Sequence, residues 1–291
     1  MNRSRLIVVE GVPGAGRTTT AVFIKDHLDS LGVPARLYRE GELDHPADFE
    51  SVARLDSIAY AALLAAYPAQ ADLLARSVRV SGQDHFLSYR KMQIEQGAAL
   101  PADLRAELAR HDVYELPVAD YCRLSAERWA EFAAAAAQDD AVTVFECCLI
   151  QNPLTVLLAR HDASADFAGA HVRRLAGAVR DLNPGVIYLY QRDLRATLAS
   201  VAAERPPEWL AFVTGYWTGQ AYGQARGLSG FDGAVQFYED RRAVELPLLY
   251  RLPAQTLVLD SSDRDWVRCQ REVRAFVERL VARKAWMKQT I

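Results

Sequence analysis

The chain has 291 residues, of which 51% are hydrophobic and 24% charged, with a formal net charge of −3. This composition is sufficient for a large core, and no basic excess predicts a nucleic-acid or membrane partner. The four cysteines show no metal-ligand spacing and are too few for a disulfide framework, and no apolar run is long enough to span a bilayer. We therefore expect a cytoplasmic protein with small-molecule partners, and the composition leaves a homodimer open.

The first predicted elements are a strand and a helix joined by a glycine-rich turn. Residues 6–9 form a short apolar run, and Ala21, Ile24, Leu28 and Leu31 lie on one face of the helix that follows. Residues 11–19 between them read GVPGAGRTT, which has the G-x-x-x-x-G-x-[ST] spacing of a phosphate-binding loop with Arg17 in the place of lysine.

This loop predicts a nucleotide site at a helix N-terminus, where backbone N–H groups and the helix dipole favour a polyphosphate. We expect the Thr18 hydroxyl to ligate Mg²⁺. Arg17 keeps the positive charge of lysine but is longer and donates through a planar fork. It can clamp the β- and γ-phosphates, which we prefer, or it can mark a loop adapted to another phosphate-bearing ligand. The expected nucleotide-binding residues of the loop are Gly11, Pro13, Gly14, Ala15, Gly16, Arg17, Thr18 and Thr19.

The rest of the chain alternates predicted strands and helices. Strands are predicted at 34–38, 141–145, 185–190 and 255–259, and helices at 193–204 and 263–288, with two more between 153 and 182. Residues 44–140 have a helix-like composition rich in alanine and leucine, and residues 215–233 are rich in glycine and predicted to be mobile. The pattern predicts an α/β protein of the P-loop NTPase type, a single domain (1–291) with a parallel five-stranded sheet flanked by helices and a helical insertion at 44–140.

Charged residues follow the predicted strands at several points. Because ligands bind at the carboxyl edge of a parallel sheet, we expect these side chains to meet there. They are Glu10, Glu40, Glu146, Arg192 and Asp260.

The chain resembles the thymidylate kinase and deoxynucleoside kinase group of P-loop kinases. Val9-Glu10-Gly11 before the loop, Arg39-Glu40-Gly41, Phe145-Glu146 and Leu259-Asp260-Ser261-Ser262 are similar to segments of those families. The resemblance implies that Glu40 is the base for the acceptor hydroxyl, that Asp260 lies beside the nucleotide base, and that a LID-like region spans 205–233. In this chain Cys147 replaces an arginine that follows the acidic residue in those families, which removes one expected phosphate contact.

These residues allow phosphoryl transfer from ATP or GTP with Mg²⁺ to a small hydroxylated acceptor such as a nucleoside, a nucleotide or an antibiotic-like metabolite. Arg17 is expected to reach the terminal phosphate, Thr18 and Glu146 to hold the metal, and Glu40 to accept or orient the acceptor proton. Arg192 and Arg205 are expected to neutralise charge in the transition state. The insertion at 44–140 is expected to supply acceptor specificity.

Two other classes stay open at this point. A sulfotransferase would use a phosphate loop without the kinase lysine, and Arg192 and Ser200 have the Arg/Ser spacing that such enzymes use for a 3′-phosphate. A nucleotide sensor without turnover is the other class, since Arg17 and the missing arginine after Glu146 would disable catalysis.

Overall fold

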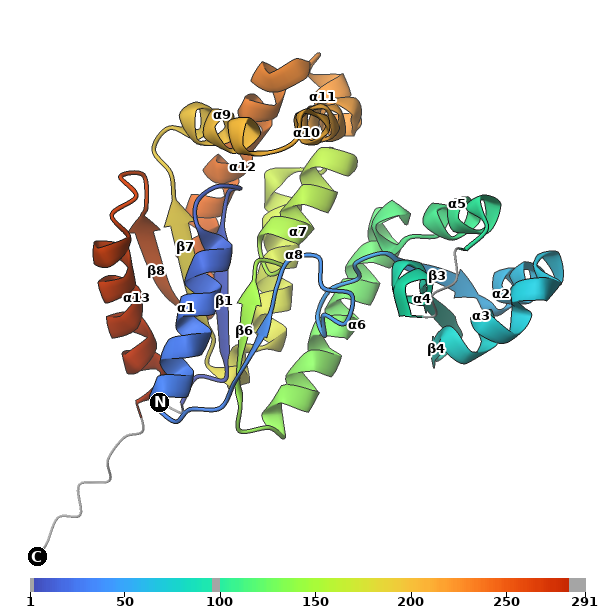
Figure 1. Ribbon diagram of the computed structural model, residues 1–291, viewed down its shortest axis with the longest axis horizontal. Coiled ribbons are helices and arrows are strands. Elements are labelled where there is room, and N and C mark those ends of the chain that lie inside the picture. The colour runs from blue at the N-terminus through green and yellow to red at the C-terminus, as the bar shows by residue number, and fades with distance from the viewer. Residues whose placement is uncertain (1–2, 96–99, 283–291) are drawn as a thin grey trace, which may run out of the picture. The chain divides into compact units, whose positions relative to one another are not determined.

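The computed structural model describes residues 3–95 and 100–282, and the part of the predicted last helix beyond residue 282 lies outside this range. The chain divides into two compact units (Figure 1). A large unit comprises residues 1–40 and 126–291, and a small unit comprises residues 41–125.

The large unit contains a parallel five-stranded sheet in the order β2-β6-β1-β7-β8. Its first and central strand, β1, is buried along its whole length because it lies inside the sheet and carries only apolar residues before Glu10. The predicted α/β fold with five parallel strands is confirmed. The strands are β1 (Leu6–Gly11), β2 (Ala35–Tyr38), β6 (Val142–Glu146), β7 (Gly185–Tyr190) and β8 (Gln255–Asp260).

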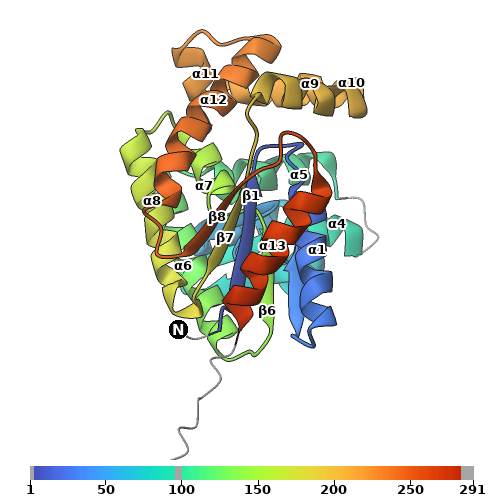
Figure 2. The same ribbon diagram turned by 90° about the vertical axis from the view of Figure 1, so that its left-hand side faces the viewer.

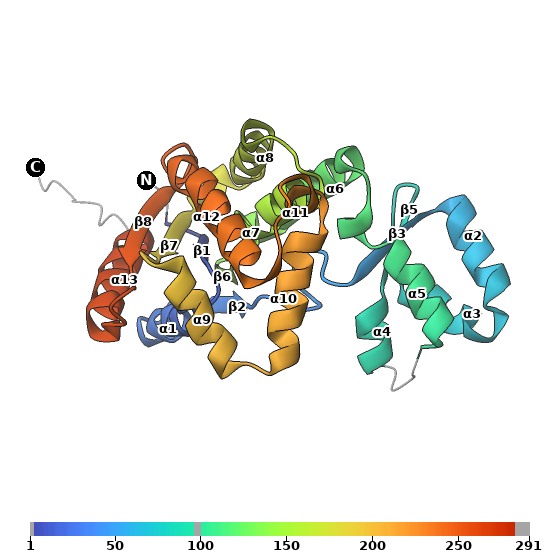
Figure 3. The same cartoon turned by 90° about the horizontal axis from the view of Figure 1, so that it is seen from above.

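Helices cover both faces of this sheet. On one face α1 and α13 lie side by side, as Figure 2 shows, and α8 lies on the opposite face with α12 beside it. The helices α9, α10 and α11 lie over the carboxyl edge of the strands (Figure 3). The helices of the large unit are α1 (Arg17–Ser30), α7 (Gln151–Leu154), α8 (Ala165–Ala178), α9 (Leu194–Glu204), α10 (Pro207–Gly219), α11 (Ala221–Ala225), α12 (Gly230–Leu249) and α13 (Trp266–Val281), with a π-helical turn at Thr155–Arg160.

The small unit differs from the predicted helical insertion in both content and extent. It holds a three-stranded antiparallel sheet in the order β3-β5-β4, and its boundary at 41–125 falls inside α6 (Val118–Ala137). The alternation in Val78-Arg79-Val80 is the period of a strand, but it spans too few residues to stand out among the alanine-rich helices around it. Its elements are β3 (Val52–Asp56), α2 (Ser57–Ala66), α3 (Ala71–Ser77), β4 (Val78–Ser81), β5 (Asp84–Ser88), α4 (Tyr89–Glu95), α5 (Ala102–Arg110) and the first part of α6.

The glycine-rich stretch at 215–233, which the sequence predicts to be mobile, is helical over most of its length. Those residues belong mainly to α10, α11 and the start of α12. A Cβ atom at Gly223 would lie 2.5 Å from the Thr218 carbonyl oxygen, and one at Gly233 would lie 2.8 Å from the Thr218 methyl group. These glycines therefore allow close packing between helices, which their frequency in the sequence does not distinguish from flexibility.

Within the described ranges, no single helix combines the length and apolar character needed to cross a membrane, and only the sharply bent pair Ser57–Ala66 and Pro68–Ser77 meets these criteria when taken together.

Candidate functional site

The glycine-rich turn joins β1 to α1 at the carboxyl edge of the sheet. Gly14 and Gly16 have φ angles of +82° and +95°, so the turn uses backbone conformations that favour glycine. Both positions also lack space for a side chain. A Cβ at Gly14 would lie 2.4 Å from a methyl group of Val201, and one at Gly16 would lie 2.3 Å from the indole of Trp266. The turn is thus held between α9 and the first residue of α13.

A buried network fixes the outer side of the turn. The Ser261 hydroxyl lies 3.1 Å from the Ala15 carbonyl oxygen and 2.7 Å from Nε2 of Gln191, which donates to it. The side-chain carbonyl oxygen of Gln191, Oε1, in turn accepts from the Thr197 hydroxyl at 3.0 Å. These contacts join the turn to the ends of β7 and β8 and to α9, so residues distant in sequence fix the position of the turn.

The Thr18 hydroxyl donates to Glu146 Oε1 at 2.6 Å. Thr18 lies in the first turn of α1, and Glu146 is the last residue of β6, which pairs with β1 so that Val9 lies opposite Glu146. A hydroxyl and a carboxylate are the oxygen ligands that Mg²⁺ uses when it keeps several waters and binds phosphates. The predicted metal residues therefore lie together. No larger group of metal-binding side chains occurs in the described part of the chain.

Arg17 and Glu40 form an ion pair with an N–O distance of 2.6 Å, although they come from α1 and from the segment after β2. Burial alone would lower the pKa of Arg17, but the charges of Glu40 and of other acidic groups outweigh burial and raise that pKa above its ordinary value. Only 7% of the Arg17 side chain is exposed, against 45% for Glu40. The predicted phosphate-binding cation and the predicted base therefore contact each other directly.

Gln151 completes this cluster and was not predicted from the sequence. Its side-chain carbonyl accepts from Arg17 Nη1, and its Nε2 donates to Glu40 Oε1 at 2.5 Å. The signal available in the sequence was its place shortly after the strand that delivers Glu146, directly before Asn152-Pro153 at the start of a helix.

Glu10 is turned into the protein, and its carboxylate holds the loop that carries Gln151. Its oxygens accept from the backbone N–H groups of Leu149, Ile150 and Gln151 at 3.0, 2.8 and 3.2 Å. Cys147 and Cys148 in this loop have φ angles of 60° and 75°, which non-glycine residues seldom adopt. The three hydrogen bonds to Glu10 help to hold the loop in this strained form.

Burial raises the pKa of Glu10 to about 7, with a further increase from the nearby charge of Glu245 and a partial offset from the backbone donors and Arg17. Glu245 belongs to a second buried network, in which it accepts from the Tyr188 hydroxyl at 2.5 Å and pairs with Arg241 at 2.8 Å. The carboxyl of Glu10 therefore changes its charge near neutral pH.

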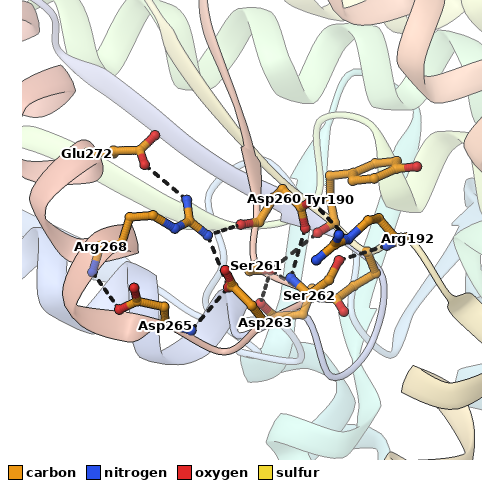
Figure 4. A network of polar contacts seen from close by, with 11 residues as sticks. Tyr190, Arg192, Asp260, Ser261, Ser262, Asp263, Asp265, Arg268 and Glu272 are labelled. Carbon is orange, nitrogen blue, oxygen red and sulfur yellow. Dashed lines mark hydrogen bonds and ion pairs between the residues drawn. The ribbon is translucent and has the colours of Figure 1, made fainter.

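Arg192 and Asp260 lie together at the ends of β7 and β8, with an N–O distance of 3.2 Å (Figure 4). The backbone N–H of Ser262 donates to Asp260 Oδ1 at 2.9 Å, and Arg268 contacts both Asp263 and the Asp260 carbonyl. The hydrogen bond to Ser262 holds the pKa of Asp260 below its ordinary value. The loop after β8 is therefore well ordered beside the phosphate loop.

The remaining predicted site residues make fewer contacts with this cluster. Arg205 is exposed in the turn between α9 and α10, and no ion pair involves it within the described residues. Pro13 is half-buried in the phosphate loop, and Thr19 lines a small hollow with Phe23 and Trp266. The structure thus brings Arg17, Thr18, Glu40 and Glu146 into two adjoining pairs, and it does not place Arg205 with them.

Comparison with known proteins gives little further information. No model of a known protein family matches the chain. No curated protein matches it either. Among solved structures, the chain is similar to one titled "Crystal structure of APE1195", with 12% sequence identity over 97% of this chain and 99% of that chain and a TM-score of 0.41. The structure defines the class of the fold, an α/β protein with a parallel five-stranded sheet and a glycine-rich turn between β1 and α1.

Proposed function

We propose that the protein is a Mg²⁺-dependent phosphotransferase that moves the γ-phosphate of ATP or GTP to the hydroxyl of a small acceptor. The observation that supports this most is that the two residues after the glycine turn each contact a carboxylate from a neighbouring strand end. Arg17 pairs with Glu40, and Thr18 donates to Glu146. A phosphate-binding cation, an acceptor-side carboxylate and a pair of metal-binding oxygens are the parts that phosphoryl transfer needs.

In this mechanism the backbone N–H groups of the loop hold the β- and γ-phosphates at the N-terminus of α1. Arg17 donates to the terminal phosphate oxygens, and Glu40 accepts the proton of the acceptor hydroxyl as that oxygen bonds to the γ-phosphorus. The bond between the γ-phosphorus and the β–γ bridging oxygen breaks, and the nucleoside diphosphate leaves with that oxygen. Mg²⁺ held by Thr18 and Glu146 would neutralise charge on the phosphates.

Arg192 is the nearest candidate for further charge neutralisation at the edge of the sheet, once its pairing with Asp260 opens. Arg205 would need a movement of the turn between α9 and α10 to take part, and the LID-like role of 205–233 is proposed on the same condition. Asp260 and the ordered loop after β8 are proposed to lie beside the nucleotide base.

A nucleotide sensor without turnover is the second candidate. The observation that favours it is the closed cluster of Arg17, Glu40 and Gln151, in which the two charged groups bind each other directly. A sulfotransferase has less support, since Ser200 accepts from Arg264 at 2.9 Å while Arg192 pairs with Asp260.

Calorimetric titration with ATP, GTP and 3′-phosphoadenosine-5′-phosphate, each with and without Mg²⁺, separates these functions. The phosphotransferase and the sensor predict triphosphate binding that Mg²⁺ strengthens, whereas a sulfotransferase predicts metal-independent binding of the bisphosphate alone. An acceptor screen for diphosphate release then separates the first two. In the phosphotransferase, Glu40→Gln loses turnover by about 100-fold, the size typical of general-base loss, without weaker nucleotide binding. Undiminished turnover in that variant would remove Glu40 as the base.

A further inference from the structure

The hydrogen bonds among Arg17, Gln151 and Glu40 form a closed ring. Arg17 Nη1 donates to the Gln151 carbonyl, Gln151 Nε2 donates to Glu40 Oε1, and Arg17 Nη2 donates to Glu40 Oε2 at 2.6 Å. Each carboxylate oxygen of Glu40 thus has its own donor. Arginine can only donate and an ionised carboxylate can only accept, so the residue between them must do both.

Glutamine meets this requirement with a neutral side chain. An apolar residue at 151 would leave one donor of Arg17 and one oxygen of Glu40 without this partner, and a glutamate would place a second negative charge beside Glu40. Gln151 is 8% exposed, so water has little access to replace the hydrogen bonds of its side-chain amide. The side chain therefore links the cation of the phosphate loop to the acceptor-side carboxylate.

The backbone of Gln151 is fixed independently of this ring. Its N–H donates to Glu10 Oε2 at 3.2 Å, and the preceding residues Leu149 and Ile150 donate to Glu10 Oε1. Glu10 is the residue next to Gly11 at the end of β1, so the same strand positions both the phosphate loop and the amide of Gln151. The central strand thus positions two of the three members of the ring, Arg17 through the glycine-rich turn and Gln151 through Glu10.

We propose that Gln151 is a positioning residue that couples the occupancy of Arg17 to the release of Glu40, an inference that rests on the proposed phosphotransfer function. In the structure Arg17 donates to both Glu40 and Gln151. A triphosphate competes for both guanidinium nitrogens, and Glu40 loses the donor on Oε2 while Gln151 keeps Oε1 oriented. Glu40 then accepts a proton only when a triphosphate is in place.

If this coupling holds, Gln151→Leu and Gln151→Glu have opposite effects on the affinity for the triphosphate. In Gln151→Leu, Arg17 loses a partner that it has only in the empty state, so the triphosphate binds about tenfold more tightly, which corresponds to about 1.4 kcal/mol. In the same variant kcat falls about tenfold because Glu40 is no longer oriented. In Gln151→Glu, a second carboxylate holds Arg17 in the empty state, and triphosphate affinity falls about tenfold.

The experiment measures Kd for ATP or GTP with Mg²⁺ by calorimetry, and kcat with an acceptor, for the full-length parent and both variants. Gln236→Leu is the matched control, because Gln236 also donates to a carboxylate, Asp240, at 2.9 Å but lies exposed on α12. Opposite shifts of Kd for Gln151→Leu and Gln151→Glu, with an unchanged control, support the coupling.

Weaker triphosphate binding in both Gln151 variants would overturn the inference, since a purely structural role loosens the loop in either case. That outcome leaves the proposed function standing as long as the parent turns over. If the parent binds no triphosphate at all, the proposed function fails and the coupling fails with it. Opposite Kd shifts without turnover for any acceptor would support competition between Gln151 and the triphosphate for Arg17, would overturn the release of Glu40 as a base, and would favour the sensor.

Discussion

The substitution Glu10→Gln tests whether the carboxyl at the end of β1 carries its proton at neutral pH. Burial raises the pKa of Glu10 from the ordinary value of 4.5 to about 7. Between these values the carboxyl is ionised in the unfolded chain and protonated in the folded one. Folding therefore becomes less favourable as the pH rises through this window, and the stabilisation present below pH 4.5 is lost above pH 7.

The magnitude follows from the size of this shift. Each pKa unit corresponds to about 1.4 kcal/mol, so the parent loses roughly 2 to 3 kcal/mol of unfolding free energy between pH 5 and pH 8 from this group. Glutamine has the shape of glutamate and carries no charge at any pH, but its NH2 group only donates, so the backbone N–H groups of residues 149–151 have a single acceptor oxygen in place of two. Glu10→Gln is therefore expected to be less stable than the parent near pH 5, and the difference in unfolding free energy is expected to move in favour of the variant by roughly 2 to 3 kcal/mol between pH 5 and pH 8.

Urea unfolding followed by tryptophan fluorescence measures the difference in unfolding free energy between the parent and Glu10→Gln for the large unit. All five tryptophans occur from residue 129 onward, within the large unit that contains Glu10. The comparison cancels Asp112 of the small unit, whose pKa burial raises to about 6, because that group is present in both proteins. Stability curves of parent and variant that run parallel from pH 5 to pH 8 would refute the reasoning, because they would mean that Glu10 titrates normally.

Three further predictions concern ligand binding. Gly16→Ala places a methyl group 2.3 Å from the Trp266 ring at a φ of +95°, and we expect at least about tenfold weaker triphosphate binding, whereas Gly177→Ala, with nothing within 4 Å, leaves the calorimetric Kd unchanged. Glu146→Gln is expected to abolish the Mg²⁺ enhancement of triphosphate binding, and a retained enhancement in titrations with and without the metal would reject Glu146 as a metal residue. Arg17→Ala is expected to weaken triphosphate binding by about tenfold or more; calorimetric affinity equal to that of the parent would show that Arg17 does not contact the phosphates.

The local sequence pattern was sufficient to predict most of the secondary structure of the large unit. All five parallel strands were predicted. The inner strands β1, β6 and β7 are buried and therefore mostly apolar, whereas the edge strands β2 and β8 include polar residues and are only partly buried. The spacing of the glycines and Thr18 predicted the loop between β1 and α1, since this turn depends on neighbouring residues alone. The contact between Thr18 and Glu146 was also expected, because parallel strands end at a common edge.

The tertiary structure decided the features that depend on residues distant in sequence. The three-stranded sheet of the small unit was missed because strand pairing joins short segments whose individual patterns are weak. Gly223 and Gly233 pack closely against Thr218, a contact that joins separate helices. Gln151 became a candidate only when the fold placed it between Arg17 and Glu40, 134 and 111 residues away along the chain. Hydrogen bonds between residues so far apart in sequence depend on how the chain packs, so local sequence patterns do not predict them.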